Sequence, residues 1–341
     1  MVTIYDIAKA CGCSSATVSK ALNNYSDVNV NTKERILKMA KEMGFTPNSQ
    51  AQALSTKKTW NIGVLFEDEN QSGLTHYYFS HVLQAVKEQA EEKGYDLTFI
   101  SKNLGGDRMS YLEHCRRRNT DGVVIACIDF KDPQVIELMQ SEIPVVTIDF
   151  ASDSVSAIMS DNYTGMYELT KYVIDHGHSD IVYFYGHAAY VTSERIYGFK
   201  RAMEDSGLEL SDRNLVMSKY NDKGVTCSLI DEMLTWQTFP TAIIFSDDYS
   251  AVWGMRYMAE KGIRIPEDVS IAGFDGLEFG EMVTPRLTTM QQNTSRIGKE
   301  AALKCIQALE TKSEDKTRVI CGTQLIRGGT VTAPRVKAAL K

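Results

Sequence analysis

The sequence has no run of eighteen or more apolar residues, and its amino-terminal segment is polar. We therefore expect no membrane-spanning helix and no secretion signal. Cysteine is scarce, because the 341 residues contain seven cysteines, an odd number scattered along the chain. That pattern suits reduced thiols and not a disulfide framework, so the expected location is cytoplasmic.

Motifs for catalysis and cofactor binding are also lacking. The chain has no G-x-S-x-G nucleophile turn, no H-E-x-x-H zinc motif and no phosphate-binding P-loop, and its six histidines are dispersed. Cys11 and Cys13 could form half of a metal site, but no second Cys or His pair lies nearby in the sequence, which favours packing thiols. We expect a protein that is not an enzyme, with no catalytic residue, no metal and no cofactor.

What the chain does have is an uneven distribution of charge. Residues 1–59 contain eight lysine or arginine residues and four acids, a net charge of +4, so the remaining residues must carry −11 to give the total of −7. A basic head on an acidic body is typical of a protein that docks one end on phosphate, as DNA-binding proteins do.

Two short helices are predicted at the amino terminus. Thr3 can cap the first, and Asp6 follows three residues later, close to a capping box. Residues 12–14 end this helix, and the second runs from Ser15 to Leu22. Two short helices joined by a glycine turn predict a helix-turn-helix, whose second helix enters the DNA major groove.

A third helix follows, capped by Asn31 or Thr32 and ended by Gly44. Its buried face is predicted to hold Ile36, Leu37, Met39, Ala40 and Met43. The alternative is a three-helix bundle that binds protein, and the basic charge argues against it.

Residues 48–55, directly after Pro47, form an alanine-rich segment that contains Leu54. Eight residues are too few for a stable helix in water, so we expect this segment to become helical only when it is buried in a DNA groove. Leu54 is then a wedge that could open a base step from the minor groove. The alternative is a plain interdomain linker with a chance leucine.

From Trp60 onward, predicted strands and helices alternate. The strands are expected at 62–66, 97–100, 122–128, 145–148, 181–185, 242–245 and 269–272, and helices at 79–93, 166–176, 196–206 and 250–261. This alternation predicts doubly wound parallel sheets, and roughly 280 residues favour two such lobes. Ligands in these folds bind beyond the carboxyl ends of the strands.

Several separate motifs occur in the order of one known family. They are Tyr5-Asp6-Ile7-Ala8, residues 12–23, Pro47-Asn48-x-x-Ala51-x-x-Leu54, Ile62-Gly63-Val64, Asp121-Gly122-Val123, Ile143-Pro144-Val145-Val146, Asp161-Asn162, Arg195-x-x-Gly198-Phe199, Ile271-Ala272-Gly273-Phe274-Asp275 and Leu287-Thr288-Thr289. In these motifs the chain resembles the LacI/GalR family of bacterial transcriptional regulators.

The resemblance implies an N-terminal all-α helix-turn-helix head and an α/β core of two doubly wound parallel-sheet lobes, like a periplasmic binding protein. The expected domains are the head at 1–46, a hinge helix and linker at 47–59, and an effector-binding and dimerisation core at 60–341. Three chain crossings near 160, 291 and 325 would divide the core into an N-lobe (about 60–160 and 292–325) and a C-lobe (about 161–291 and 326–341). The tail at 333–341 shows no leucine heptad long enough for a tetramerising coiled coil, so a homodimer on a palindromic operator is expected.

The expected DNA contacts lie in the head and the hinge. Ser15, Ala16 and Lys20 are spaced to face base edges, where the lysine could reach guanine O6 and N7. The family more often has arginine at this position, and lysine lacks its bidentate fork, so weaker discrimination is expected. Further contacts, mostly to phosphate, are expected from Thr3, Tyr5, Thr17, Ser19, Asn23, Asn31 and Thr32, and hinge contacts from Asn48, Ala51 and Leu54.

The resemblance also implies an effector site. Its expected members are Tyr78, Phe79, Asp149, Arg195, Tyr220, Asp247, Asp275 and Gln291. Arg195 and Asp275 could instead pair with each other and staple the lobe. Asp247 stands where the family often has asparagine, so this position gains a charge and loses an amide donor.

Two classes of small-molecule effector are considered. Ala188-Ala189 replaces an arginine of the family's purine-responsive branch, so a sugar or glycoside is favoured over a purine-type corepressor. The expected function is that of a DNA-binding transcriptional regulator that acts as a repressor and is under allosteric control by this effector. The more distant alternative is a solute-binding receptor without DNA function.

Overall fold

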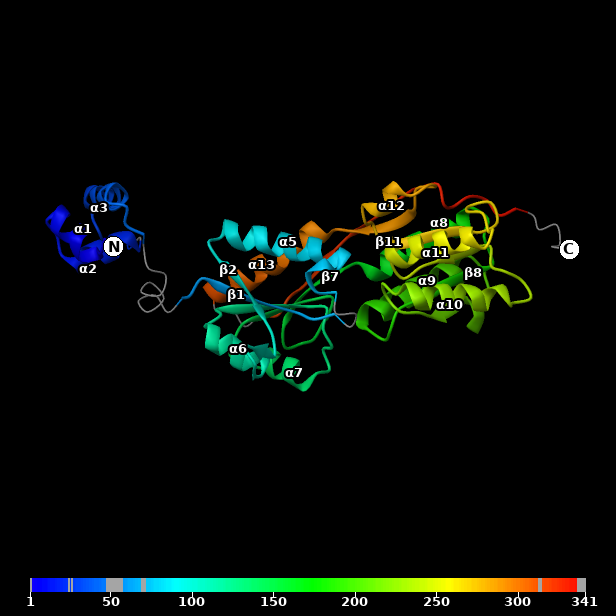
Figure 1. Cartoon of the computed structure of the whole chain (residues 1–341), viewed down its shortest axis with the longest axis horizontal. Coiled ribbons are helices and arrows are strands. Elements are labelled where there is room, and N and C mark those ends of the chain that lie inside the picture. The colour runs from blue at the N-terminus through cyan, green and yellow to red at the C-terminus, as the bar shows by residue number, and fades with distance from the viewer. Residues whose placement is uncertain are drawn as a thin grey trace. The chain divides into compact units, whose positions relative to one another are not determined.

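The computed structural model describes residues 2–23, 25, 27–46, 58–68, 72–311 and 315–335. The chain divides into two compact units, a head at 1–60 and a core at 61–341, which are described separately (Figure 1). Within the described residues, no helix combines the length and the apolarity needed to cross a membrane.

The head consists of α1 (Ile4–Cys11), α2 (Ser15–Leu22) and α3 (Val30–Glu42). The predicted capping box is present, because the Thr3 side chain accepts from the Asp6 backbone and the Asp6 carboxylate accepts from the Thr3 backbone. Gly12 ends α1 at φ 60°, a left-handed conformation that glycine adopts without strain. Each helix gives one fully buried apolar side chain to the core of the head, namely Ile7, Val18 and Ile36.

The start of α3 differs from the prediction. Asn29 is its N-cap, and its side chain accepts from the backbone N–H of Asn31 at 3.0 Å. The helix therefore begins before Asn31 and Thr32, because an earlier residue of equally good capping type was available. Leu37 was also expected in the core, but it is 43% exposed. It follows Ile36 by one position, about 100° around the helix, and so faces away from the core.

The N-lobe is built on a six-stranded parallel sheet with the order β13-β7-β6-β5-β1-β2. Its strands are β1 (Asn61–Phe66), β2 (Asp96–Ile100), β5 (Gly122–Ala126), β6 (Val145–Ile148), β7 (Ser156–Ser160) and β13 (Arg318–Cys321). One face is covered by α5 (Tyr77–Glu92) and α13 (Thr294–Thr311), and the other by α6 (Tyr111–Arg118) and α7 (Pro133–Met139). The smaller elements are η1 (Gly73–Thr75) and the hairpin of β3 (Asn103–Leu104) and β4 (Asp107–Arg108).

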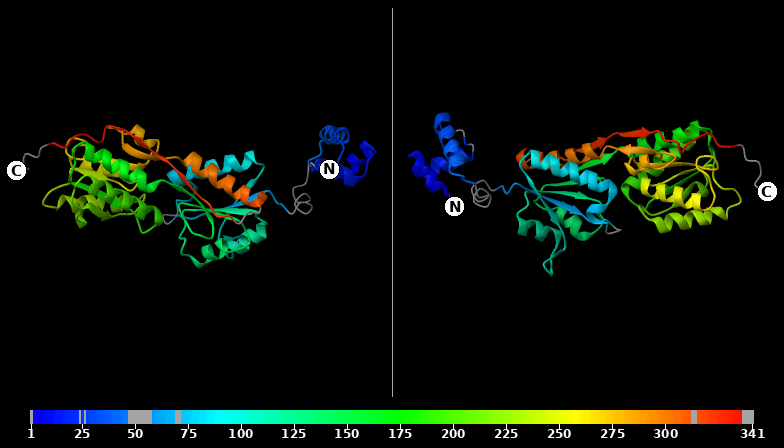
Figure 2. Two further views of the ribbon diagram at one scale, coloured as in Figure 1. Left: turned by 180° about the vertical axis from the view of Figure 1, so that it is seen from behind. Right: turned by 45° about the horizontal axis from the view of Figure 1, so that its top comes forward.

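The C-lobe repeats this plan with the strand order β14-β12-β11-β10-β8-β9. Its strands are β8 (Ile181–Tyr185), β9 (Leu215–Met217), β10 (Ala242–Ile244), β11 (Ser270–Asp275), β12 (Thr288–Gln292) and β14 (Thr323–Ile326), the last antiparallel to β12. One face packs on α8 (Asn162–Asp175) and α9 (Tyr190–Asp205), the other on α10 (Lys223–Leu234) and α11 (Asp248–Glu260). The short elements are η2 (Asp212–Asn214) and α12 (Phe279–Met282). Both views in Figure 2 show the helices on the two faces of each sheet.

The predicted fold class is confirmed, and the chain crosses between the lobes between β7 and α8, between β12 and α13, and at Gly322. The third crossing was predicted near 325 and is wrong by three residues. Because β14 pairs with β12 from residue 323, residues 323–325 belong to the C-lobe. Only Gly322 separates β13 from β14, so the two lobes share one nearly continuous strand segment.

Candidate functional site

The second helix of the head presents small and cationic side chains to solvent. Ala16 and Lys20 are exposed, while Ser15 and Ser19 are half-buried. The Lys20 ammonium forms an ion pair with Asp27, in the loop that leads to α3. The helix therefore offers a methyl group, a hydroxyl group and a charge on one side, a combination that can read base edges.

The remaining head residues predicted to contact DNA differ in exposure and in the hydrogen bonds of their side chains. Tyr5 is 71% exposed, whereas the Thr17 hydroxyl is engaged with that of Ser14 at 2.8 Å. The Thr3 hydroxyl donates to Asp6 at 2.7 Å, and the Asn23 amide donates to the Ser19 carbonyl at 2.9 Å. Asn31 is exposed and Thr32 is half-buried. The hinge residues Asn48, Ala51 and Leu54 lie outside the described residues.

A cleft of about 330 Å³ lies between the two lobes of the core. It is lined by strand ends, loops and the amino-terminal turns of helices from both lobes. The N-lobe contributes residues of 67–68, 76–79, 127–131 and 148–150, and the C-lobe contributes residues of 187–191, 195, 219–221, 247, 249, 275, 277 and 292. Seven of the eight predicted effector residues line this cleft, namely Tyr78, Phe79, Asp149, Arg195, Tyr220, Asp247 and Asp275. The cleft thus has the position that ligand sites take in parallel α/β sheets.

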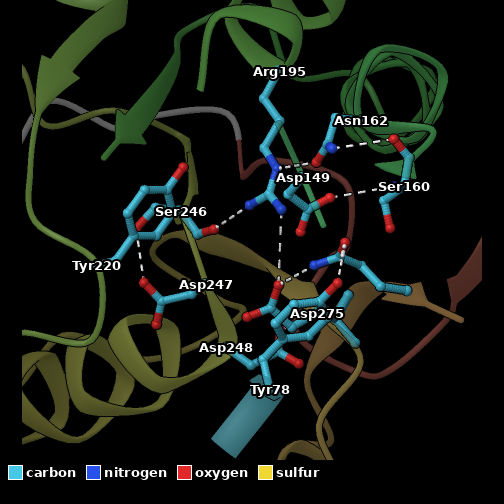
Figure 3. Close-up of polar contacts among 12 residues, drawn as sticks. Tyr78, Asp149, Ser160, Asn162, Arg195, Tyr220, Ser246, Asp247, Asp248 and Asp275 are labelled. Atoms are coloured by element: carbon cyan, nitrogen blue, oxygen red, sulfur yellow. Dashed lines mark hydrogen bonds and ion pairs between the residues drawn. The ribbon is translucent and has the colours of Figure 1, made fainter. Parts of the chain in front are cut away.

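Arg195 is the buried centre of the polar network, with 4% of its surface exposed (Figure 3). Its Nε donates to Asn162 Oδ1 at 2.7 Å, and its Nη1 donates to the Ser246 carbonyl at 2.9 Å. Its Nη2 lies 3.9 Å from the nearer carboxylate oxygen of Asp275, and its guanidinium stacks 3.8 Å above the centre of the Phe274 ring. Two of the three guanidinium nitrogens, Nε and Nη1, are thus bonded to protein groups. The third, Nη2, points toward Asp275 at a distance too long for a hydrogen bond.

The eighth predicted residue, Gln291, does not line the cleft. It is exposed, and its neighbour Gln292 is buried at the cleft instead. The Gln292 amide donates to Asp275 Oδ1 at 2.7 Å, and its oxygen accepts from the Tyr78 hydroxyl at 3.2 Å. The prediction was wrong by one residue, and consecutive residues of a strand face opposite sides, so the shift moved the side chain out of the cleft.

Two carboxyl groups in the cleft have unusual protonation behaviour. Burial raises the pKa of Asp275 to about 7, although the nearby charge of Arg195 acts in the opposite direction. Burial also raises the pKa of Asp149 to about 6, again opposed by Arg195. Both groups therefore change protonation near neutral pH, and each can accept or donate a hydrogen bond to an uncharged ligand.

Asp247 and Asp248 hold the local structure together. The Asp247 carboxylate caps α11 through the backbone N–H of Ser250 at 2.7 Å, and it also accepts from the hydroxyls of Ser246 and Ser250 and from the backbone of Asn221. These four donors occupy about all the acceptor positions of a carboxylate. Asp248 is fully buried and accepts from the Leu277 backbone at 2.7 Å, and burial raises its pKa well above the ordinary value.

Aromatic rings form the walls of the cleft. In the N-lobe, the rings of Phe130 and Phe150 stack at 4.1 Å with an angle of 4° between their planes. In the C-lobe, the Tyr220 ring packs so closely on Gly186 that a Cβ atom there would lie 1.9 Å from Tyr220 Cε2. Only glycine therefore permits this position of the tyrosine ring.

Backbone strain is concentrated around the same cleft. Six non-glycine residues of the described chain have positive φ, and four of them line the cleft, namely Cys127, Asp149, Asn221 and Asp275. Such conformations cost about 1–3 kcal/mol each and persist where the surroundings enforce them, which is common at ligand sites.

Family models match both units of the chain. Residues 3–48 match the bacterial regulatory proteins of the lacI family, and residues 59–327 match the periplasmic binding proteins and sugar-binding domain of the LacI family. The chain belongs to the LacI family. It is therefore a DNA-binding transcriptional regulator of this family, as the resemblance predicted.

The chain is similar over more than nine-tenths of its length to other members of the LacI family. It is 32% identical over 325 residues to the HTH-type transcriptional repressor PurR of Vibrio vulnificus, covering 93% of this chain and 94% of that protein. The fold is also that of the lac repressor dimer bound to operator and the anti-inducer ONPF, with a TM-score of 0.79, 22% identity and 97% and 99% of the two chains covered. A cellobiose complex of the regulator CelR has a TM-score of 0.71 at 22% identity, with 97% and 100% covered.

Several residues around the cleft of this LacI-family chain were missed from the sequence. Asn162 and Gln292 hold Arg195 and Asp275, and Phe130, Phe150 and Tyr249 line the walls. Asn162 stood within a recognised motif, Asp161-Asn162, and its capping-type neighbour was a usable signal. Phe130 and Phe150 lie in loops after strands, where sequence periodicity gives no indication of side-chain direction, and Tyr249 lies in the first turn of α11.

Proposed function

We propose that this regulator is a repressor that binds a palindromic operator as a homodimer, and that an uncharged sugar or glycoside in the cleft sets its affinity for DNA. The observation that carries the proposal is one polar network, centred on Arg195 and Asp275, at the strand ends of a two-lobed core on a chain with a helix-turn-helix head. A donor fork facing a carboxylate across 3.9 Å leaves room for ligand hydroxyls that bond to both.

The charge of the lining favours a neutral or cationic ligand over an anion. The lining includes six carboxylates, Glu67, Asp68, Asp129, Asp149, Asp247 and Asp275, against the three cations Lys131, Arg195 and Lys219. Ala188 and Ala189 lie in the lining, where they add no charge. Aromatic walls complete the site, since they stack well on the C–H faces of sugars.

A purine-type corepressor is the second candidate. It is favoured by the similarity to repressors called PurR and by the tyrosine and phenylalanine at 78 and 79, since aromatic faces also stack on purines. The absence of a cation at 188 and 189 speaks against it. Either ligand would bond to Asp275, so the two candidates share one site and differ in the groups presented to it.

The proposed mechanism links the cleft to the segments that cross between the lobes. Asn162, bonded to Arg195, begins α8 directly after the first crossing, and Gln292, bonded to Asp275, ends β12 directly before the second. Gln292 also accepts from Tyr78 of the N-lobe, so one amide joins the ligand-facing carboxylate to the opposite lobe. A ligand that bonds to Asp275 would alter this link and favour one lobe angle over another.

On the DNA side, we propose that Ser15, Ala16 and Lys20 contact base edges. Thr3, Tyr5, Thr17, Ser19, Asn23, Asn31 and Thr32 would contact mainly phosphate. Residues 47–59 would form the hinge, with Asn48, Ala51 and the Leu54 wedge in the minor groove of the operator centre. The lobe angle would set the spacing of the two hinges of a dimer, and the role requires a cytoplasmic location.

The proposal is tested by one pair of measurements on the full chain. A thermal-shift screen over sugars, glycosides, nucleobases and nucleosides identifies what binds, because a ligand specific to the folded state raises the melting temperature. Fluorescence anisotropy with an operator duplex, selected by the protein from a random pool, then measures DNA affinity with and without each hit. We expect a sugar or glycoside to change operator affinity, whereas a response to purines alone would replace the first candidate by the second. Ligand binding without any preference for a DNA sequence would instead indicate a solute receptor without DNA function.

A further inference from the structure

The ion pair between Lys20 and Asp27 joins the proposed recognition helix to the loop that follows it. The Lys20 ammonium donates to the Asp27 carboxylate, and this partner raises the pKa of Lys20. Both side chains remain accessible, with 50% and 55% of their surface exposed. An exposed pair of this kind contributes little to folding stability, so its position suggests another role.

The neighbours of Asp27 hold it beside the helix. The Tyr25 backbone N–H donates to the Lys20 carbonyl at 3.0 Å, so the loop begins anchored to the end of α2. On the other side, Val28 packs against the head core and Asn29 caps α3. Asp27 therefore lies between two anchored points, and its carboxylate stays within reach of Lys20.

Two of the other three acids of the head are engaged elsewhere, and the third, Glu34, is exposed on α3. Asp6 completes the capping box with Thr3, and Glu42 lies 3.9 Å from Lys38 on α3. Asp27, in contrast, pairs with Lys20 of the proposed recognition helix, so it lies on the side of the head that would meet negatively charged DNA. A carboxylate in that position weakens the attraction to phosphate, which is the main source of sequence-independent affinity.

We propose that Asp27 is a specificity-determining residue, which keeps Lys20 from neutralising phosphates and reserves it for a base edge. This inference rests on the proposed DNA contact of Lys20. To reach a phosphate, Lys20 must leave Asp27, whose carboxylate then stands unpaired in the field of the DNA. At a guanine, the three donors of the ammonium allow bonds to O6 or N7 while one donor stays on Asp27. The carboxylate therefore lowers non-specific affinity more than operator affinity.

The test compares Asp27→Asn with the wild-type chain on two duplexes of equal length, the selected operator and a scrambled sequence. We expect the variant to bind scrambled DNA about 3–10-fold more tightly and operator less than about 2-fold more tightly, so that the specificity ratio falls. The salt dependence on scrambled DNA should steepen by about one counterion per head, because Lys20 then pairs with a phosphate.

Two controls separate this role from a general charge effect. Glu34→Gln removes one charge from the exposed face of α3 and should strengthen binding to both duplexes by the same factor. In a Lys20→Gln background, Asp27→Asn should likewise affect both duplexes equally, since no ammonium is left to guide.

The inference is overturned if Asp27→Asn, in the wild-type background, increases the affinity for both duplexes by the same factor. It is also overturned if the variant binds operator more weakly and scrambled DNA unchanged, because Asp27 would then contact a base itself. Wild-type protein that selects no sequence from the random pool would overturn the proposed function, and this role with it.

Discussion

The two walls of the cleft are built in different ways. The C-lobe wall is a bonded polar network in which Arg195, Asp275 and Gln292 are each held by other protein groups. The N-lobe wall presents packed aromatic rings together with the carboxyl groups of Glu67, Asp68, Asp129 and Asp149. We infer from this difference that the two lobes have different roles. The C-lobe orients the ligand, and the N-lobe covers it and responds to its presence.

This comparison has an energetic basis. Preorganised donors and acceptors recognise a ligand by geometry, since a missing partner leaves buried groups unpaired. Aromatic covering surfaces contribute through area and tolerate variation in ligand shape. Changes in the C-lobe wall should therefore have larger and more selective effects than changes in the N-lobe wall.

The largest effect is expected from Arg195→Ala. The substitution leaves Asp275 without its nearest cation and Asn162 without its donor, so we expect a loss of about 3–5 kcal/mol in the free energy of unfolding of the core. Ligand binding should disappear. Urea unfolding and ligand titration measure the two effects, with Arg201→Ala on the exposed face of the same helix as control. If unfolding is unchanged, the network does not hold the C-lobe wall.

Asp275→Asn should weaken ligand binding by about 1.5–3 kcal/mol, the usual contribution of a hydrogen bond to a charged group. Operator binding without ligand should survive, because Asp275 lies in the core. Calorimetry of ligand binding measures the loss. A variant that still responds to ligand as the wild type does would remove Asp275 from the site.

The protonation of Asp275 predicts a pH dependence of ligand affinity. Its pKa is raised to about 7, so the group is largely protonated at pH 5.5 and ionised at pH 8. Because the ionised form is the stronger acceptor for hydroxyls, affinity should rise with pH and binding should release protons. Calorimetry in buffers of different ionisation enthalpy measures this release. In Asp275→Asn the rise should shrink to the part contributed by Asp149, and an unchanged profile would contradict the assignment.

Gln292→Leu should separate ligand binding from the DNA response. The change removes the bonds to Asp275 and Tyr78, so ligand affinity should fall by about 1–2 kcal/mol. The effect of saturating ligand on operator affinity should fall to less than half of the wild-type effect. Gln291→Leu is the matched control, because its side chain lies outside the cleft. Equal behaviour of the two variants would mean that the link between the lobes plays no part.

The smallest effect is expected on the N-lobe wall. Phe150→Ala removes one ring of the stacked pair and should lower ligand affinity by about 0.5–1.5 kcal/mol, with the order of preference among ligands unchanged. Phe99→Ala, an exposed ring on β2 outside this cleft, is the control. A changed order of preference would show that the N-lobe also selects the ligand.

The sequence predicted those parts of the fold that depend on local signals. The Thr3 capping box, the Gly12 turn and the buried strands of the core all carry their information in neighbouring residues. The positions of β12 and β14 depend on pairing between distant segments, and both strands contain polar residues, so neither was predicted. That is why the third crossing and the identity of the cleft glutamine were both wrong.

The site was predictable in its charged members and not in their partners. Arg195 and Asp275 stood in recognisable motifs, and the structure brings them together. Asp247 lines the cleft, but its carboxylate also caps a helix, a role that depends on where Ser250 and Asn221 lie. Such partners come from separate loops and follow only from the assembled fold.

The central claim is that occupancy of the cleft controls operator binding. The most direct test is a titration of the full chain with its selected operator duplex, followed by anisotropy, with and without a ligand whose binding to the core is shown by thermal shift. The account predicts at least about a tenfold change in operator affinity, which corresponds to about 1.4 kcal/mol of coupling between the two sites. Equal operator affinity with the cleft empty and saturated would contradict it.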